Sequence, residues 1–99
     1  MNRFVFRHEA ERELAREAAY YAGRREGGGE RFVAAIEAAL ERAVRQPLGG
    51  APFFAGTRRI LVKGFPFSVV YRSKDEELLI VAIVPHRRHP MYWVDCEGK

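Results

Sequence analysis

The chain has 99 residues, 47% of them hydrophobic, and a formal net charge of +4, so we expect one small domain with a thin core and no deep cofactor pocket. The excess of positive charge favours an anionic partner or serves only to keep the protein soluble. The single cysteine, Cys96, excludes an internal disulfide. The longest apolar stretch, Leu78 to Pro85, is far shorter than the roughly 20 residues that span a bilayer, and the N-terminus has no apolar run typical of a signal peptide, which favours a cytoplasmic protein with no membrane partner.

The first half of the sequence predicts a strand and two helices. Phe4-Val5-Phe6 is a short aromatic and β-branched run, typical of a strand. Apolar residues then recur three or four apart, which predicts a helix with one buried stripe made of Ala10, Leu14, Ala18, Tyr21 and Ala22. Gly27-Gly28-Gly29 is expected to end this helix in a tight turn. A second helix, which ends before Pro47, is predicted by apolar side chains at every fourth residue: Phe32, Ile36, Leu40 and Val44.

The middle of the chain predicts a loop and the first strand of a meander. Residues 47–56 contain two prolines and three glycines and no charge, which is typical of a loop. Residues 57–63 alternate between the two faces of a strand. Arg58 and Arg59 therefore point to opposite faces, and we expect one of them to face the helices and the other to face solvent.

Two further strands complete the predicted sheet. Residues 67–71 place alternate apolar side chains on one face, and residues 78–84 are apolar on both faces, which predicts an interior strand. His86 is expected to continue the phase of Leu78, Ile80, Ala82 and Val84, as a structural histidine would. The order β-α-α-β-β-β predicts a single α+β domain over residues 1–99, in which a helical hairpin packs on a small antiparallel sheet.

The residues best suited to bind a target lie on and after the last strand. Residues 85–93 hold two histidines, two arginines, a tyrosine and a tryptophan. Arginine binds phosphate through paired, charge-assisted hydrogen bonds, and tyrosine stacks on bases. The candidate target-binding residues are therefore Arg58, Arg59, Arg87, Arg88 and Tyr92. Trp93 is expected to cover the edge of the core. His86 and His89 have no evident third ligand, so we expect no metal and no other cofactor.

Motifs in both helices and in the three later strands form an ordered set. They are Glu9-Ala10-Glu11-x-Glu13-Leu14, Ala19-Tyr20-Tyr21, Phe32-x-x-x-Ile36, Arg58-Arg59-Ile60-Leu61-Val62, Phe65-Pro66-Phe67-Ser68-Val69-Val70-Tyr71 and Val81-Ala82-Ile83-Val84-x-His86-x-Arg88-x-Pro90-x-Tyr92-Trp93. This set resembles RelE/ParE-type toxins of type II toxin–antitoxin systems over about residues 4–93. The resemblance implies the fold predicted above and a toxin made beside an antitoxin protein that wraps and silences it.

The resemblance leaves the target open. RelE-like toxins cut mRNA on the ribosome, whereas ParE-like toxins block DNA gyrase. RelE-like enzymes have basic catalytic residues before and within the second strand, but residues 47–56 carry no charge and the hairpin is long, so a gyrase poison is favoured. The alternative is a metal-independent mRNA endoribonuclease, with His86 as the candidate base. In it, Arg59, Arg72 and Arg88 would stabilise the charged transition state, and Tyr92 would position the nucleotide base. A third alternative is a non-toxic, protein-binding relative on the same fold.

The antitoxin is expected to cover exposed aromatic side chains. Phe53 and Phe54 lie in the uncharged loop, and Tyr20 lies in the first helix. Aromatic residues of this kind in a small soluble domain often mark an interface. We therefore predict that Tyr20, Phe53 and Phe54 contact an extended antitoxin segment that adds to a sheet edge or lies in a groove.

Overall fold

The computed structural model describes residues 4–86, which form a layer of two helices on a five-stranded sheet. The helices are α1 (His8–Arg24) and α2 (Gly28–Arg45). The strands run in the spatial order β1-β5-β4-β3-β2, with bounds β1 Phe4–Phe6, β2 Ala51–Pro52, β3 Arg58–Leu61, β4 Phe67–Lys74 and β5 Glu77–Pro85. A single 3-10 turn, η1 (Phe54–Gly56), lies between β2 and β3. The predicted α+β fold with a helical hairpin on a sheet is confirmed.

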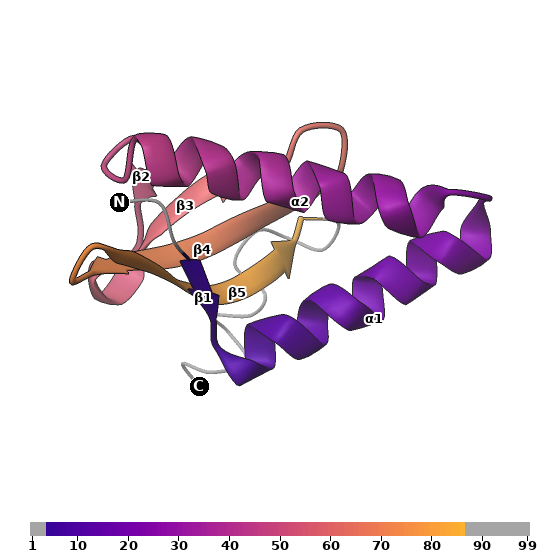
Figure 1. Ribbon diagram of the computed structural model, residues 1–99, viewed down its shortest axis with the longest axis horizontal. Coiled ribbons are helices and arrows are strands. Elements are labelled where there is room, and N and C mark those ends of the chain that lie inside the picture. Colours follow the sequence, from indigo (N-terminus) through magenta and orange to yellow (C-terminus); the bar gives the residue numbers. More distant parts are fainter. Residues whose placement is uncertain (1–3, 87–99) are drawn as a thin grey trace.

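The two helices converge at the turn that joins them and diverge toward β1 (Figure 1). Only Gly27 of the three glycines belongs to the turn, where its φ of 75° is a left-handed conformation that suits glycine. Gly28 and Gly29, predicted to be in the turn, instead begin α2. A Cβ on Gly28 would collide with the carbonyl oxygen of Tyr21, and one on Gly29 would lie 2.8 Å from that of Ala18. These two glycines therefore let the helix backbones approach closely.

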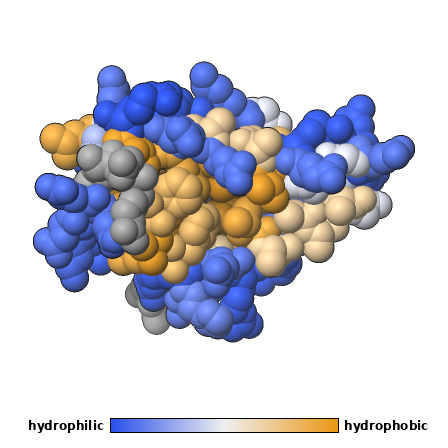
Figure 2. All heavy atoms as spheres, in the orientation of Figure 1, coloured by the Kyte–Doolittle hydropathy of each residue, from blue (hydrophilic) through white to orange (hydrophobic). Residues whose placement is uncertain are grey.

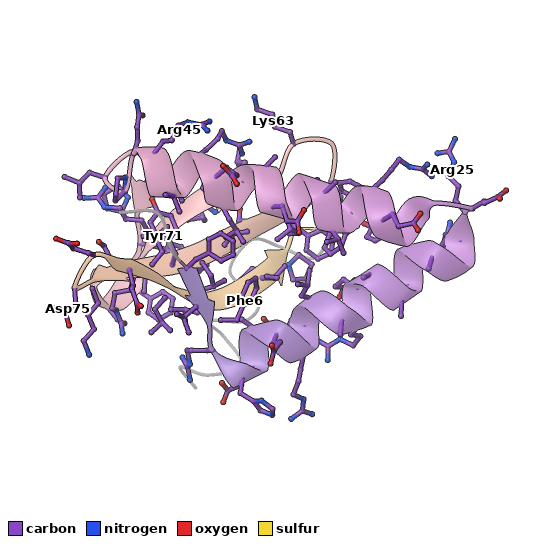
Figure 3. The ribbon with its side chains drawn as sticks, in the orientation of Figure 1. Phe6, Arg25, Arg45, Lys63, Tyr71 and Asp75 are labelled. Carbon is purple, nitrogen blue, oxygen red and sulfur yellow. The ribbon has the colours of Figure 1, made fainter. Side chains whose placement is uncertain are left out.

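The core fills the space between the helices and one face of the sheet. Its largest fully buried side chains are Tyr71, Phe32, Phe67, Ile36, Leu40, Leu78 and Ile80. At the hairpin end, the Tyr21 ring stacks on Phe32 with centroids 5.1 Å apart, and both rings meet Phe65 and Phe67 edge-on. At the other end, Tyr71 lies between α2 and the sheet (Figure 3). Burial of these apolar side chains is the main stabilising term of the fold.

Tyr71 also holds the loop that follows α2. Its hydroxyl donates a hydrogen bond to the carbonyl of Pro47 at 2.9 Å and accepts one from the amide of Gly50 at 3.2 Å. Arg58 donates to the carbonyls of Leu48 and Gly50 at 3.1 and 2.8 Å. These four bonds satisfy backbone groups that no strand or helix pairs, so they fix the path of residues 47–50.

The sheet is mixed. Strands β3, β4 and β5 form the predicted antiparallel meander, and β2 extends it by two residues. β1 adds to the other side of β5 in a parallel direction, from Phe4↔Leu78 to Phe6↔Ile80. The prediction that residues 78–84 form an interior strand is therefore confirmed for residues 78–80, which lie between β1 and β4. The apolar pattern of β1 predicted a strand but held no information on its partner or direction.

A β-bulge in β5 changes which side chains face the helices. Tyr71 pairs with Ile80 and Val70 pairs with Ala82, so Val81 is one extra residue in β5. Leu78 and Ile80 lie in the core before the bulge, and Ile83 does after it. The predicted phase of Ala82, Val84 and His86 with Leu78 is thus wrong, because a one-residue insertion exchanges the two faces of a strand.

Candidate functional site

The face of the sheet opposite the helices bears the residues that can bind a target. Arg59 on β3 lies opposite Val70 on β4, and Ser68 and Arg72 share the face of Val70 because they are two residues from it along the strand. The bulge brings His86 to the same face, where its ring meets Ser68. We call the group Arg59, Ser68, Arg72 and His86 the basic face.

The three arginines of the sheet are engaged in different ways. Arg58 lies on the helix side and donates to the backbone of residues 48–50, which confirms that one of the pair faces the helices. Arg72 donates a hydrogen bond to the carbonyl of Ala55 at 2.9 Å. The Arg59 guanidinium lies over the Phe53 ring, 5.2 Å from its centroid. Among residues 4–86, the Arg59 N–H groups have no hydrogen-bond or ion-pair partner.

Ser68 holds the imidazole of His86. The Ser68 Oγ and the His86 Nε2 are 2.7 Å apart, and the His86 amide donates to the carbonyl of Pro66 at 2.7 Å. Ser68 is only 1% exposed. Burial lowers the pKa of His86 below its ordinary value, and the positive charge of Arg59 lowers it further. The neutral imidazole is therefore favoured near pH 7, where it can accept a proton.

A cavity of about 410 Å³ adjoins this face where β1 ends. Its walls come from the sheet, η1 and the start of α1, and include Phe54, Thr57, Val70, Arg72, Val81, Ala82, Val84, Arg7, Glu9 and Glu13. The Glu13 carboxylate accepts a hydrogen bond from the Ile83 amide at 2.9 Å. Burial raises the pKa of Glu13, although the Ile83 amide opposes this effect. Glu13 thus caps a backbone group that β1, being short, leaves unpaired.

A second surface lies on the helical hairpin. Figure 2 shows apolar side chains gathered between the two helices. A groove of about 610 Å³ runs there, lined by the small residues Ala18, Ala19, Ala22, Gly27, Gly29, Val33 and Ala34 and by two acidic residues, Glu30 and Glu37. The groove is apolar with an acidic rim, unlike the basic face. At the other end of α1, Phe4 and Val5 on β1 are 37% and 42% exposed.

The predicted antitoxin residues fall into two separate places. Tyr20 is exposed on α1, where Arg24 donates to its hydroxyl at 3.1 Å. Phe54 is exposed beside the 410 Å³ cavity, and the Phe53 ring lies edge-on to it, 5.3 Å away. The structure does not bring Tyr20 together with the two phenylalanines.

The other residues singled out in the sequence analysis lie outside the described residues. They are Arg87, Arg88, His89, Tyr92, Trp93 and Cys96.

Sequence reasoning missed two residues that shape this region. Ser68 appeared only as a member of a strand motif, since one serine among apolar residues gives no signal of a partner. Glu13 was one of several acidic residues in the first turns of a helix, and nothing in its spacing predicted a bond to β5. Within residues 4–86, no three histidine, cysteine or acidic side chains gather as a metal site would require. No helix in that range is long and apolar enough to cross a membrane.

Comparison with known proteins decides the family. Residues 4–90 match the model of the ParE toxin of the type II toxin–antitoxin system parDE. The chain belongs to the ParE toxin family. This match covers every described element and the whole basic face.

One solved structure similar to this ParE family member is that of the chromosomal ParDE toxin–antitoxin system from P. aeruginosa. The two chains are 23% identical, with a TM-score of 0.63 over 86% of this chain and 96% of the other. At that identity the likeness supports the fold and not a residue-by-residue transfer of function. A search of curated proteins finds no match.

Proposed function

We propose that this chain is the toxin of a type II toxin–antitoxin pair, acts in the cytoplasm by poisoning DNA gyrase, and is silenced by a cognate antitoxin protein. The observation that supports this most is the match to the ParE family over residues 4–90. The uncharged loop 47–56, where RelE-like enzymes have basic catalytic residues, supports the same target. No cofactor is required, because binding alone blocks the target.

The basic face is the proposed target-binding surface. Arg59 and Arg72 place positive charge on two neighbouring strands, near the half-buried apolar side chain of Ala82. Such a surface attracts an anionic partner and then excludes water from part of the contact. Arg87, Arg88 and Tyr92, which follow β5 in the sequence, are proposed to extend it. Arg58 is left out, since its guanidinium is used inside the protein.

Two purified systems separate the proposed target from the alternative. In one, the toxin is incubated with gyrase and relaxed plasmid, and supercoiling is followed on a gel. In the other, it is added to translating ribosomes, and the mRNA is examined for cuts. We expect inhibited supercoiling and intact mRNA. Cleavage of mRNA at the ribosomal A site together with normal supercoiling would refute the gyrase proposal.

The endoribonuclease remains the second candidate, because Arg59 and His86 lie on one face of the sheet. In that reaction the neutral His86 imidazole would accept the proton of the ribose 2′-hydroxyl, whose oxygen attacks the adjacent phosphorus. The bond from phosphorus to the 5′ oxygen would break, the 5′ oxygen would take a proton from water, and a 2′,3′-cyclic phosphate would remain. A His86→Gln variant that keeps full toxicity while losing no activity on gyrase would argue against this chemistry.

Healthy growth on induction of the wild-type toxin alone would favour the third alternative, a non-toxic relative.

The antitoxin is proposed to cover the groove between α1 and α2, together with β1. The apolar lining suits a helix or extended segment, and the two glutamates at its rim, Glu30 and Glu37, suit basic side chains on that segment. Phe53 and Phe54 are a second proposed contact, on the opposite side of the sheet. Because both places cannot be covered by one compact module, an antitoxin that wraps around the toxin is expected. Co-expression of the neighbouring gene, followed by co-purification, tests the pairing.

A further inference from the structure

Arg59 differs from the other arginines of the sheet in what its guanidinium contacts. Arg58 donates two hydrogen bonds to backbone carbonyls and Arg72 donates one, so part of each guanidinium is engaged within the protein. Arg59 makes only a cation–π contact with Phe53 within residues 4–86. That contact orients the planar guanidinium through the attraction between its charge and the ring face, so its N–H groups are not used in hydrogen bonds to the ring. The Arg59 donors remain for a ligand.

His86 also has one group that remains for a ligand. Ser68 engages the Nε2 atom at 2.7 Å, and Nδ1 has no hydrogen-bond partner among residues 4–86, so Nδ1 is the nitrogen that can meet another molecule. Ser68 is too deeply buried to bind a ligand itself, at 1% exposure. Its hydroxyl can donate to a neutral Nε2 or accept from a protonated one, and it therefore holds the ring in both states. Ser68 is a positioning residue.

Among residues 4–86, the charged group that acts on His86 lies on β3. Arg59 on β3 acts on its pKa, whereas β4 contributes the uncharged Ser68 hydroxyl and the Pro66 carbonyl. No carboxylate among residues 4–86 acts on His86. When His86 is protonated, it and Arg59 repel each other, and an oxyanion between them would turn this repulsion into attraction.

We propose that Arg59 and His86 bind the phosphate of a phosphodiester, with Ser68 holding the imidazole in place. The guanidinium offers two parallel N–H groups to two phosphate oxygens, and His86 offers Nδ1–H. The Phe53 ring beside Arg59 favours nucleic acid over a protein carboxylate, because aromatic rings next to cations are typical of sites that bind a nucleic-acid strand. The site rests on the proposed target-binding role of the basic face, where gyrase would present its bound DNA.

Binding at this site is expected to depend on pH. A phosphodiester favours the charged imidazole, so it raises the pKa of His86, and by linkage it binds more tightly as pH falls through that pKa. A rise of about 0.5 in the pKa corresponds to about threefold tighter binding to the charged form. Replacing Arg59 removes both the repulsion in the free protein and half of the ligand contact.

The test is an NMR titration of the His86 ring in the intact chain, assigned by comparison with His86→Gln. The probe is dimethyl phosphate, a phosphodiester whose own charge does not change near neutral pH. We expect it to raise the His86 pKa by about 0.5 or more. In Arg59→Gln the pKa of the free protein should rise and the probe should no longer shift it. Ser68→Ala should weaken the probe's effect by about half or more while the repulsion from Arg59 remains. Arg45→Gln, an exposed α2 arginine, is the matched control and should behave as wild type.

Three outcomes would overturn the proposal. The first is a His86 pKa that does not respond to dimethyl phosphate, and the second is an equal response in Arg59→Gln. The third is an equal response to acetate, which would make this a carboxylate site. The result is independent of the target assay: inhibited supercoiling without a response refutes the phosphate site alone, whereas a response without inhibited supercoiling refutes the gyrase proposal alone.

Discussion

Removing the hydroxyl of Tyr71 should destabilise the protein although it removes no apolar contact. Tyr71 is fully buried, and its hydroxyl bonds to both the carbonyl of Pro47 and the amide of Gly50. In Tyr71→Phe the ring stays, but two backbone groups lose their partner. An unsatisfied buried group costs about 1–3 kcal/mol, and because the Pro47 carbonyl is only partly buried, we expect a total loss of about 2–3 kcal/mol in the free energy of unfolding.

Urea unfolding measures this loss, and the midpoint should fall while the slope stays constant, because the surface exposed on unfolding is the same. Hydrogen exchange at the Gly50 amide should quicken in the variant, since that amide loses its acceptor. Tyr20→Phe is the control, because its hydroxyl bond to Arg24 is exposed, and it should change stability by less than about 0.5 kcal/mol. A Tyr71→Phe protein as stable as wild type would refute the assignment of these bonds to loop anchoring.

Three further predictions concern the helices and the antitoxin surface. Gly29→Ala should lower stability by about 1–3 kcal/mol, because its Cβ would press on the α1 backbone. In Gly23→Ala the new Cβ meets nothing within 4 Å, so this control should stabilise α1 by about 0.5–1 kcal/mol. Equal melting temperatures of the two variants would contradict this prediction. Glu13→Gln keeps an acceptor for the β5 amide and removes a charge that burial disfavours. Since burial raises the folded-state pKa of Glu13, wild-type stability falls as pH rises through it, so the variant should be the more stable near pH 7 and equal at acid pH; a less stable variant at pH 7 would show the charge to be favourable. Phe54→Asp should weaken antitoxin binding in calorimetry more than Arg88→Ala does, and unchanged affinity would exclude that loop from the interface.

Periodicity in the sequence predicted the helices and the meander well. Apolar residues every three or four positions defined α1 and α2, and the proline at 47 marked the end of the second helix close to Arg45. These features are local, so a single sequence reveals them. The interior position of residues 78–84 in the sheet was also predictable, because a strand that is apolar on both faces is typical of the middle of a sheet.

The parts that could not be predicted depend on contacts between distant segments. Gly28 and Gly29 looked like a turn, but their role is set by how closely α1 approaches. The alternation of β5 gave no sign of the extra residue at Val81, because Leu79, Val81 and Ala82 are all apolar. His86 was consequently placed with the core, and its bond to Ser68 could not be foreseen. The prediction that Arg58 and Arg59 divide between the two faces succeeded because alternation holds within a strand as regular as β3.

The extra residue at Val81 decides which face of the sheet each later residue of β5 occupies. Before it, the even-numbered residues Leu78 and Ile80 face the helices, whereas after it the even-numbered residues from Ala82 to His86 face away from them. A deletion of Val81 would keep every side chain of the basic face in the sequence and yet turn His86 toward the helices, away from Arg59. Relatives that differ by one residue in this strand are therefore expected to differ in target rather than in fold.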